Sequence, residues 1–539
     1  MLGEVRWLDV VVLVVYFASQ VAMGPYFARR AKSTESYFVG NRNYPGWLLG
    51  VSMFGTSISS ITFVGYPADG YKTAWLRFLI CVTLPVAILI ASIWILPFFR
   101  RTNMTSAFEY LESRFGPGTR MYAALMFLVS QSIRLSLILF LVSKLVNALT
   151  GWDTTTCILV GGVITSFYTV LGGIEAVIWT DFIQAIVLTF GGLLVLIAVL
   201  YNLPGGLTTI WEVAIRDNKF VLGDPLPGTS RPVPAPLIPQ SFQDILSTKT
   251  VIMLILVGFL NWMTEYSSNQ NVVQKYCAAK TIADARRAMW INCFCSLPTW
   301  AYFMFLGTAL YVFYQVNPDP EAAKMLTGER KAEDILPYFV STHLYQGLSG
   351  IVIAGVLAAA MSSLSSSINS MSAVSVVDIY KRHLKKGASD THYVKVAKWL
   401  SLASSVIMIG GAYWLSSADT TTLQDTATKL NSISAGGLLG LFMLGFLTVR
   451  GDGRAVLVGI LFTVLFSSAF SLYELGLFAN IAPGLHAFLK ANFDTYYVTV
   501  VGNIVMFVLG YIFGMLLPAR KRDLKNLTVW TQDESMPAT

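Results

Sequence analysis

The sequence predicts an all-α protein that crosses a membrane about 13 times. Hydrophobic residues make up 55% of its 539 residues and charged residues only 13%, whereas soluble proteins average about 25% charged residues. A water-soluble chain of this length would not cover its surface with so few charges. The composition therefore excludes a soluble enzyme, a nucleic-acid-binding protein and a disordered scaffold. The five cysteines form no CxxC pair, so we interpret them as small core residues rather than metal ligands.

Hydrophobic runs supply the predicted spans, because a membrane helix needs about 20 apolar residues. Runs free of Asp, Glu, Lys, Arg and His cover residues 10–28, 43–68, 78–99, 154–174, 182–211, 288–318, 346–377, 400–418, 430–449, 455–473 and 495–519. Two further runs are interrupted by charge. Residues 121–149 contain Arg134 and Lys144, and residues 250–270 contain Glu265. Together these runs predict 13 spans.

Basic residues set the expected orientation, because cytoplasmic loops carry an excess of Lys and Arg. If 13 helices alternate, one side of the membrane receives the clusters within residues 29–32, 100–114, 275–287, 381–386, 450–454 and 520–525. We therefore expect a multi-pass protein of the cell membrane, with its N-terminus outside and its C-terminus in the cytoplasm. The first run is interpreted as a retained helix, because it lacks a small-x-small cleavage site.

The predicted loops contain no soluble domain of catalytic size. Residues 175–181 are expected to be a cytoplasmic loop, and the proline-rich residues 202–249 an extended extracellular cap. Residues 316–346 are polar, with a short helix expected around residues 331–343. The chain has no GxxxxGK[ST] phosphate loop, which argues against an ATP-driven pump.

Two spans have the composition of a helix that is broken inside the membrane. Residues 50–70 read GVSMFGTSISSITFVGYPADG, and residues 258–274 read GFLNWMTEYSSNQNVVQ. Transporters unwind helices at mid-membrane depth because freed backbone groups can then bind ions and substrate. Each of these spans opens a block of five, so the hydropathy pattern predicts two inverted five-helix repeats.

A third polar segment is residues 358–372, which read AAAMSSLSSSINSMS. Small residues at this density can serve helix packing, with hydroxyls bonded back to their own helix. The alternative is a site for a hard monovalent cation, since hydroxyls and freed carbonyls replace its water shell. Packing accounts for one or two serines better than for five.

Two charged side chains require a partner or a task, Arg134 in the middle of a predicted span and Asp181 near the inner end of one. Arg134 could bind the carboxylate of a substrate, or it could form an internal pair with Glu265. Asp181 could be a cation ligand, or it could cap a helix start at the cytoplasmic loop. The residues themselves leave these alternatives open.

At these positions the chain resembles the sodium:solute symporter family, and its bacterial sialic acid branch in particular. The likeness covers about residues 5–520. It rests on ESYFVGNRNYPGWLLGVSMFGTSISSITFVG (35–65), YTVLGGIEAVIWTDFIQA (168–185), NQNVVQKY (269–276) and AAAMSSLSSSINSMSAVSVVDIY (358–380). It implies a LeuT-type fold with one extra helix before the first repeat and two after the second.

The resemblance also implies ligands. A main sodium site between the first and eighth core helices would use Gly55, Ile58, Ala359, Ser362 and Ser363. A second sodium site would use Asp181, Ser362, Ser365 and Ser366. The substrate pocket matches Ser57, Ser59, Ser60, Thr62 and Arg134, with the arginine on a carboxylate.

Four positions near the pocket depart from that branch. Cys81 stands where the branch has a glutamine, and Trp262 where it has an asparagine, with Asn261 one place earlier. Glu265 replaces a neutral amide, and Arg77 replaces an aromatic residue. A free Arg134 favours an acid sugar. An Arg134 neutralised by Glu265 favours a neutral sugar or polyol, with Trp262 or Trp75 stacked on the ring.

The sequence therefore predicts a secondary active symporter, not an enzyme, that couples sodium entry to uptake of sialic acid or a related sugar acid. The alternatives are a symporter of a neutral sugar or polyol and, more remotely, an ion channel. Sodium, the solute and the lipid bilayer are the expected partners, with no other cofactor, no nucleic acid and a monomeric protein. The expected regions are residues 1–42 (extra helix), 43–204 (first repeat), 205–247 (extracellular loop), 248–450 (second repeat), 451–519 (two helices) and 520–539 (cytoplasmic tail).

Overall fold

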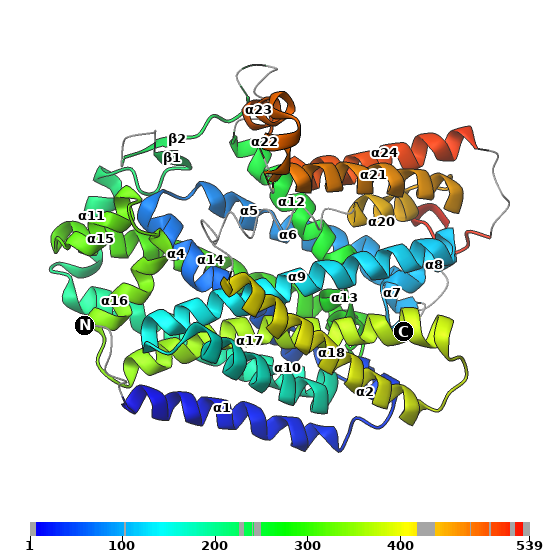
Figure 1. Cartoon of the computed structure of the whole chain (residues 1–539), viewed down its shortest axis with the longest axis horizontal. Coiled ribbons are helices and arrows are strands. Elements are labelled where there is room, and N and C mark those ends of the chain that lie inside the picture. The colour runs from blue at the N-terminus through cyan, green and yellow to red at the C-terminus, as the bar shows by residue number, and fades with distance from the viewer. Residues whose placement is uncertain are drawn as a thin grey trace.

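The computed structural model describes residues 7–101, 104–225, 231–239, 241, 249–417, 437–474, 476–494, 497–517 and 523–531. Its described part is almost entirely helical, and most of the long helices run roughly parallel to one another (Figure 1). The one sheet found there is an antiparallel pair, β1 (Gly223–Pro225) with β2 (Pro232–Pro234). The all-α prediction is therefore confirmed.

Nine helical segments of the described chain are long and apolar enough to cross a membrane. They are α1 (Trp7–Ala28), the run Leu76–Arg100, α9 (Pro117–Thr150), α10 (Thr154–Asn202), α14 (Ile282–Val316), the run Leu348–Leu384, α18 (Asp390–Ser417), Gly453–Phe470 within α21 (Gly453–Glu474), and α24 (Tyr497–Leu516). The run Leu76–Arg100 is made of η2 (Leu76–Phe78), α5 (Leu79–Val82), α6 (Leu84–Ile90), η3 (Ala91–Ile95) and α7 (Leu96–Arg101). The run Leu348–Leu384 is made of α17 (Leu348–Val374) and η6 (Ser375–Leu384).

Both spans predicted to be broken are broken. Helices α3 (Gly46–Ser57) and α4 (Ser60–Lys72) meet at 58°. Helices α12 (Val251–Ser267) and α13 (Gln270–Cys277) meet at 51°. The breaks coincide with runs of Ser, Thr and Asn, whose side chains compete with the helix for backbone hydrogen bonds.

Helix α10 contains two predicted spans that fold back on each other. Its backbone leaves helical geometry at Gly173, where φ is 60°, a conformation that glycine adopts without steric cost. A straight helix would separate residues 168 and 184 by about 24 Å, yet Gln184 Nε2 donates to the Tyr168 hydroxyl at 3.3 Å. The expected loop at residues 175–181 is therefore wrong, because the chain turns earlier and these residues are helical.

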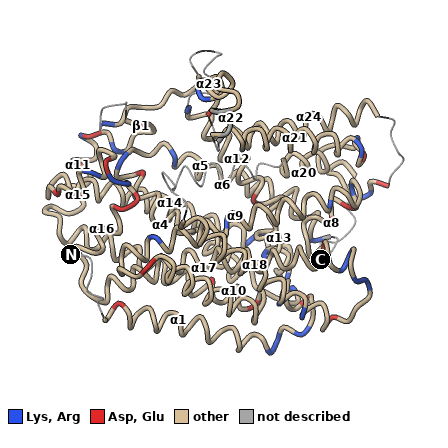
Figure 2. The backbone as a smooth tube through the Cα atoms, viewed as in Figure 1, with Lys and Arg blue, Asp and Glu red and all other residues tan. Residues whose placement is uncertain are grey.

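The two polar ends of the molecule carry short elements. One end holds α11 (Gly206–Arg216), α15 (Pro320–Thr327), η5 (Ala332–Asp334) and α16 (Ile335–His343), and the other holds α2 (Thr34–Val39), η1 (Gly40–Arg42) and α8 (Phe108–Phe115). The helix expected around residues 331–343 is thus present. The run 182–211 is shorter than expected, because the chain leaves α10 before Pro204 and α11 follows as a separate helix. Figure 2 shows charged residues gathered toward these ends and a mostly uncharged middle.

The C-terminal part adds helices beside the core. They are α20 (Leu438–Leu447), α22 (Leu477–Ile481), α23 (Pro483–Asn492) and η7 (Val529–Thr531). The first part of the predicted span 430–449 and much of the predicted tail 520–539 lie outside the described residues. The count of 13 spans and the region boundaries therefore stay predictions.

Helix α1 is fixed to the N-terminus of α17 by a buried carboxylate. Asp9 accepts from the backbone nitrogens of Gly347 at 2.6 Å and Gly350 at 2.8 Å, and from the Ser349 hydroxyl at 2.7 Å. A carboxylate is favourable there because a helix N-terminus leaves donors unpaired and carries partial positive charge. This contact positions the helix that carries the serine-rich segment.

Candidate functional site

The end of α3 meets the serine-rich part of α17 at the centre of the molecule. The Ser362 hydroxyl donates to the Gly55 carbonyl at 2.6 Å and to the Ala359 carbonyl at 3.2 Å. The Ser363 hydroxyl donates to the Thr56 carbonyl at 3.0 Å. All of these residues are buried. The carbonyls at the end of α3 are available because the helix breaks immediately after them.

The structure thus brings together four of the five residues predicted for the main sodium site, namely Gly55, Ala359, Ser362 and Ser363. Ile58 is the residue at the break itself, buried, with its amide bonded to the Phe54 carbonyl. The remaining contact of this cluster is the Thr56 carbonyl, which we had not singled out. Its serine hydroxyls could turn their lone pairs to a cation, because a hydroxyl both donates and accepts.

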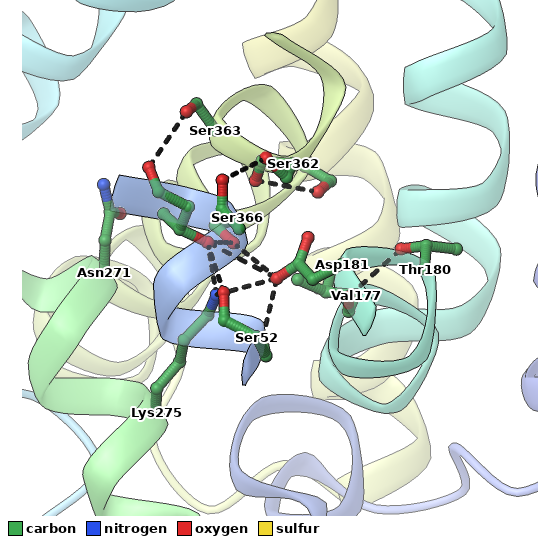
Figure 3. Close-up of polar contacts among 12 residues, drawn as sticks. Ser52, Val177, Thr180, Asp181, Asn271, Lys275, Ser362, Ser363 and Ser366 are labelled. Atoms are coloured by element: carbon green, nitrogen blue, oxygen red, sulfur yellow. Dashed lines mark hydrogen bonds and ion pairs between the residues drawn. The ribbon is translucent and has the colours of Figure 1, made fainter. Parts of the chain in front are cut away.

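Asp181 lies next to this cluster and is fully buried (Figure 3). Its Oδ2 accepts from Ser52 at 2.7 Å, and from Thr56 and Ser366 at 3.4 Å each. Its Oδ1 has no hydrogen-bond partner among the described residues. The helix-cap interpretation of Asp181 is wrong, because the residue lies within α10 and faces α3 and α17.

Lys275 is the cation that pairs with Asp181. Its Nζ lies 2.7 Å from Asp181 Oδ2 and 3.0 Å from the Ser52 carbonyl, and it also donates to the Thr56 hydroxyl. The Lys275 side chain is only 2% exposed, so it does not belong to the cytoplasmic basic cluster to which we had assigned it. The sequence did contain one indication that Lys275 faces the interior. It lies four residues after Asn271, which places both side chains on one face of α13.

The other serines predicted for a second sodium site lie on the same face of α17. Ser366 contacts both Asp181 and the Thr56 hydroxyl, the latter at 3.0 Å. Ser365 donates to the Ser362 carbonyl at 3.2 Å and lies beside the Tyr168 hydroxyl. The cluster is therefore built from hydroxyls, carbonyls and one carboxylate, which is the ligand chemistry of a hard cation. The described residues contain no group of three or more His, Cys, Asp or Glu that could hold another kind of metal.

The four hydroxyl residues predicted to touch substrate lie at the break between α3 and α4. Ser57 and Ser59 are half-buried, whereas Ser60 and Thr62 are buried. The Ser60 hydroxyl has no hydrogen-bond partner in the described part of the chain. A buried hydroxyl without a partner is costly, so the Ser60 hydroxyl is free to form a hydrogen bond.

Arg134 is half-buried on α9, one turn beyond Gln131. Gln131 accepts from Asn271 at 3.3 Å, and Asn271 donates to Ser367 at 3.0 Å, so this face of α9 points to the junction of α13 and α17. Among the described residues Arg134 forms no ion pair with Glu265, which instead accepts from Asn269 at 2.8 Å.

Trp262 and Cys81, two residues expected to differ from those of the sialic acid branch, both contact other residues of the protein. The Trp262 Nε1 donates to the Ile80 carbonyl at 2.9 Å, and its ring packs on Trp300. Cys81 lies 2.9 Å from the Tyr66 hydroxyl.

Three further residues considered near the pocket have the following surroundings. Trp75 packs on Phe220 and bonds Thr308. Arg77 pairs with Asp69 at 2.9 Å. Asn261 is exposed.

The model of the sodium:solute symporter family matches residues 37–462. The chain belongs to this family. A curated relative from Proteus mirabilis, the sodium/sialic acid symporter SiaT, is 33% identical over 86% of this chain and 89% of that protein. The sodium/sialic acid symporter NanT of Aliivibrio fischeri is 28% identical over 94% of this chain and 92% of its own. Human sodium-coupled monocarboxylate transporter 1 is 28% identical over 84% of this chain and 71% of that protein.

Solved structures agree with the family assignment. A Na⁺-coupled sialic acid symporter, solved in a substrate-bound outward-open state, superposes with a TM-score of 0.80 at 28% identity and covers 97% of this symporter and 100% of its own chain. Mhp1, a nucleobase-cation-symport-1 family transporter in a closed conformation, superposes with a TM-score of 0.53 at 15% identity. The match covers 92% of this chain and 98% of the Mhp1 chain. The predicted LeuT-type fold of this symporter is therefore confirmed.

Proposed function

We propose that this symporter couples inward sodium flow to uptake of sialic acid or a related sugar acid. The acidic substrate is supported mainly by the position of Arg134. Its guanidinium forms no ion pair within the described residues and lies on the face of α9 that points to the broken helices. An arginine fork binds a carboxylate through two parallel hydrogen bonds. The SiaT and NanT relatives, named as sialic acid symporters, support the same substrate.

The proposed sodium ligands follow the oxygen cluster. The main site would use Gly55, Ile58, Ala359, Ser362 and Ser363, and the second would use Asp181, Ser362, Ser365 and Ser366. The hydrogen bonds from Ser362 and Ser363 to α3 carbonyls support the first site. The Asp181 Oδ1, buried without a partner in the described chain, supports the second.

The proposed pocket comprises Ser57, Ser59, Ser60, Thr62, Cys81, Arg134, Asn261, Trp262 and Glu265. A neutral sugar or polyol remains the second candidate, since Trp262 offers a partly exposed ring. It is the weaker candidate because Glu265 bonds Asn269 instead of neutralising Arg134.

The proposed arrangement in the membrane follows the basic residues. The N-terminus would lie outside and the C-terminus in the cytoplasm, and the protein would act as a monomer with sodium as its coupling ion. Two sodium ions entering with a singly charged anion would gain about 5 kcal/mol from a tenfold gradient and a 100 mV potential. That free energy concentrates the anion several thousand-fold.

The test is uptake of labelled N-acetylneuraminate and labelled galactose into proteoliposomes, with sodium or potassium outside. We expect sodium-dependent, saturable uptake of the acid alone. Uptake of galactose alone would overturn the substrate, and flux that does not saturate would indicate a channel.

Arg134→Met provides the matching variant. It should reduce acid uptake about 30-fold or more, because losing a buried charge partner costs 2 kcal/mol or more. Lys144→Met, which removes another positive charge from the same helix, is the control and should retain uptake. Equal losses in the two variants would contradict the role of Arg134.

A further inference from the structure

The Asp181 carboxylate uses its two oxygens very differently. Oδ2 is held by Lys275, Ser52, Thr56 and Ser366, whereas Oδ1 has no partner among the described residues. The four partners of Oδ2 come from three helices, α3, α13 and α17. One buried carboxylate therefore joins four elements, its own α10 included, and offers one oxygen to a further cation (Figure 3).

Helix α13, which carries Lys275, has further polar anchors besides the bonds from Asn271 to Gln131 and Ser367. Gln274 Nε2 donates to the Phe38 carbonyl of α2 at 2.6 Å. Gln270 donates to the Thr105 carbonyl at 2.7 Å and accepts from the Ala107 amide at 2.8 Å. These side-chain anchors are neutral hydrogen bonds of about 1 kcal/mol net each. At the C-terminal end of α13, Arg42 and Arg100 also donate to the Cys277 carbonyl. The Lys275–Asp181 contact is thus the one ion pair that α13 makes in the described chain.

A polar cavity lies directly against these anchors. It has a volume of about 400 Å³ and is lined by residues that include Phe38, Thr105, Val376 and Lys381. Phe38 and Thr105 are the residues whose carbonyls accept from α13. The cavity is on the end of the molecule that holds α2 and α8, which is the proposed cytoplasmic end. Displacing α13 would therefore connect Asp181 to a space that already exists.

We infer that Lys275 is a tethered cation that competes with sodium for Asp181, and that its release from Asp181 opens α13 toward this cavity. The inference rests on the proposed function, because it takes the Asp181 site as a sodium site. A sodium ion on Oδ1 would lie within the ~4–6 Å over which neighbouring charges act strongly on each other. Sodium binding then weakens the hold of Lys275 and links occupation of the second site to inward opening.

Linkage makes the inference quantitative. If sodium weakens the Lys275–Asp181 contact, loss of Lys275 must strengthen sodium binding by the same factor. Lys275→Met in the purified full chain should lower the concentration of ²²Na⁺ for half-saturation about 10-fold, within the usual range of such couplings. Lys275→Arg keeps the charge and should retain the wild-type affinity, as should Lys280→Met, which removes a neighbouring exposed lysine.

Cys277, at the end of α13, reports the opening separately. It is buried, and its carbonyl accepts from Arg100 at 2.9 Å. The background keeps the buried Cys81 of the proposed pocket and replaces Cys157, Cys293 and Cys295 by serine. In that background, a membrane-impermeant thiol reagent added at the cytoplasmic face should label Cys277 slowly. Without sodium, Lys275→Met should raise that labelling rate about 10-fold or more, to the rate that sodium and substrate produce in the parent.

The outcomes separate this inference from the proposed function. Unchanged or weaker sodium binding in Lys275→Met, or Cys277 protected as in the parent, would overturn the inference while sodium-driven uptake stands. Absence of any sodium effect in the unmodified chain would overturn the proposed function instead. If Lys275→Met fails to fold, Asp181→Asn/Lys275→Met removes both charges. That variant should label Cys277 rapidly and independently of sodium, and slow labelling would refute the gate.

Discussion

Ser363→Ala separates sodium binding from helix packing. Ser363 and Ser370 lie on the same helix and are equally buried, with 1% exposure each. The Ser363 hydroxyl donates across to the Thr56 carbonyl at 3.0 Å, whereas the Ser370 hydroxyl donates back to the Ser366 carbonyl of its own helix at 2.7 Å. The two variants therefore remove the same chemical group from similar surroundings, and only one removes a proposed ligand.

The two variants are expected to differ in sodium affinity and to resemble each other in stability. Each variant loses the hydrogen bonding of one neutral hydroxyl, which lowers the free energy of unfolding by about 0.5–1.5 kcal/mol. Ser363→Ala also leaves a buried cation one ligand short, and an unsatisfied buried group costs about 1–3 kcal/mol. That penalty corresponds to sodium binding that is weaker by about 5- to 150-fold.

Sodium affinity is measured by ²²Na⁺ binding to the purified protein, and stability by thermal unfolding in the same buffer. We expect similar melting temperatures for the two variants, with weaker sodium binding in Ser363→Ala alone. Equal sodium affinities would refute the main site. A large loss of stability confined to Ser363→Ala would show that this hydroxyl serves packing.

Three further predictions concern other parts of the fold. Asp9→Ala should lower the free energy of unfolding by about 3 kcal/mol or more, since charge-assisted hydrogen bonds at the start of α17 are lost. Chemical denaturation measures this loss. A loss below about 1 kcal/mol would contradict the role of Asp9 in capping α17. Burial lowers the pKa of Lys219 from 10.5 to about 7, so the unfolded chain binds more protons between pH 7 and 10 and stability rises with pH there. The melting temperature should rise from pH 7 to 9 relative to Lys219→Met, and parallel pH profiles would refute this. Gly307→Ala should slow uptake, because its new Cβ would meet the Pro67 carbonyl of α4; unchanged maximal uptake would show that α4 and α14 need not stay in contact.

Local sequence determined the membrane character and the position of the breaks. Long uncharged runs fix spanning helices, because every backbone group must be paired in the bilayer. The Ser, Thr and Asn clusters near Ser59 and Asn269 identified the broken spans for the same local reason. The early turn at Gly173 was missed, because a tight reversal at a single glycine leaves no polar loop in the sequence.

Which polar residues meet was decided only by the tertiary structure. Asp181 and Lys275 are 94 residues apart, and neither hydropathy nor spacing links them; Lys275 in fact adjoins a basic loop that masks its role. The choice between Arg134 paired with Glu265 and Arg134 free likewise depends on how α9 and α12 are rotated against each other. Sequence periodicity gives the face of each helix, but the packing of four helices around one carboxylate is a property of the whole fold, because it requires contacts that no single segment contains.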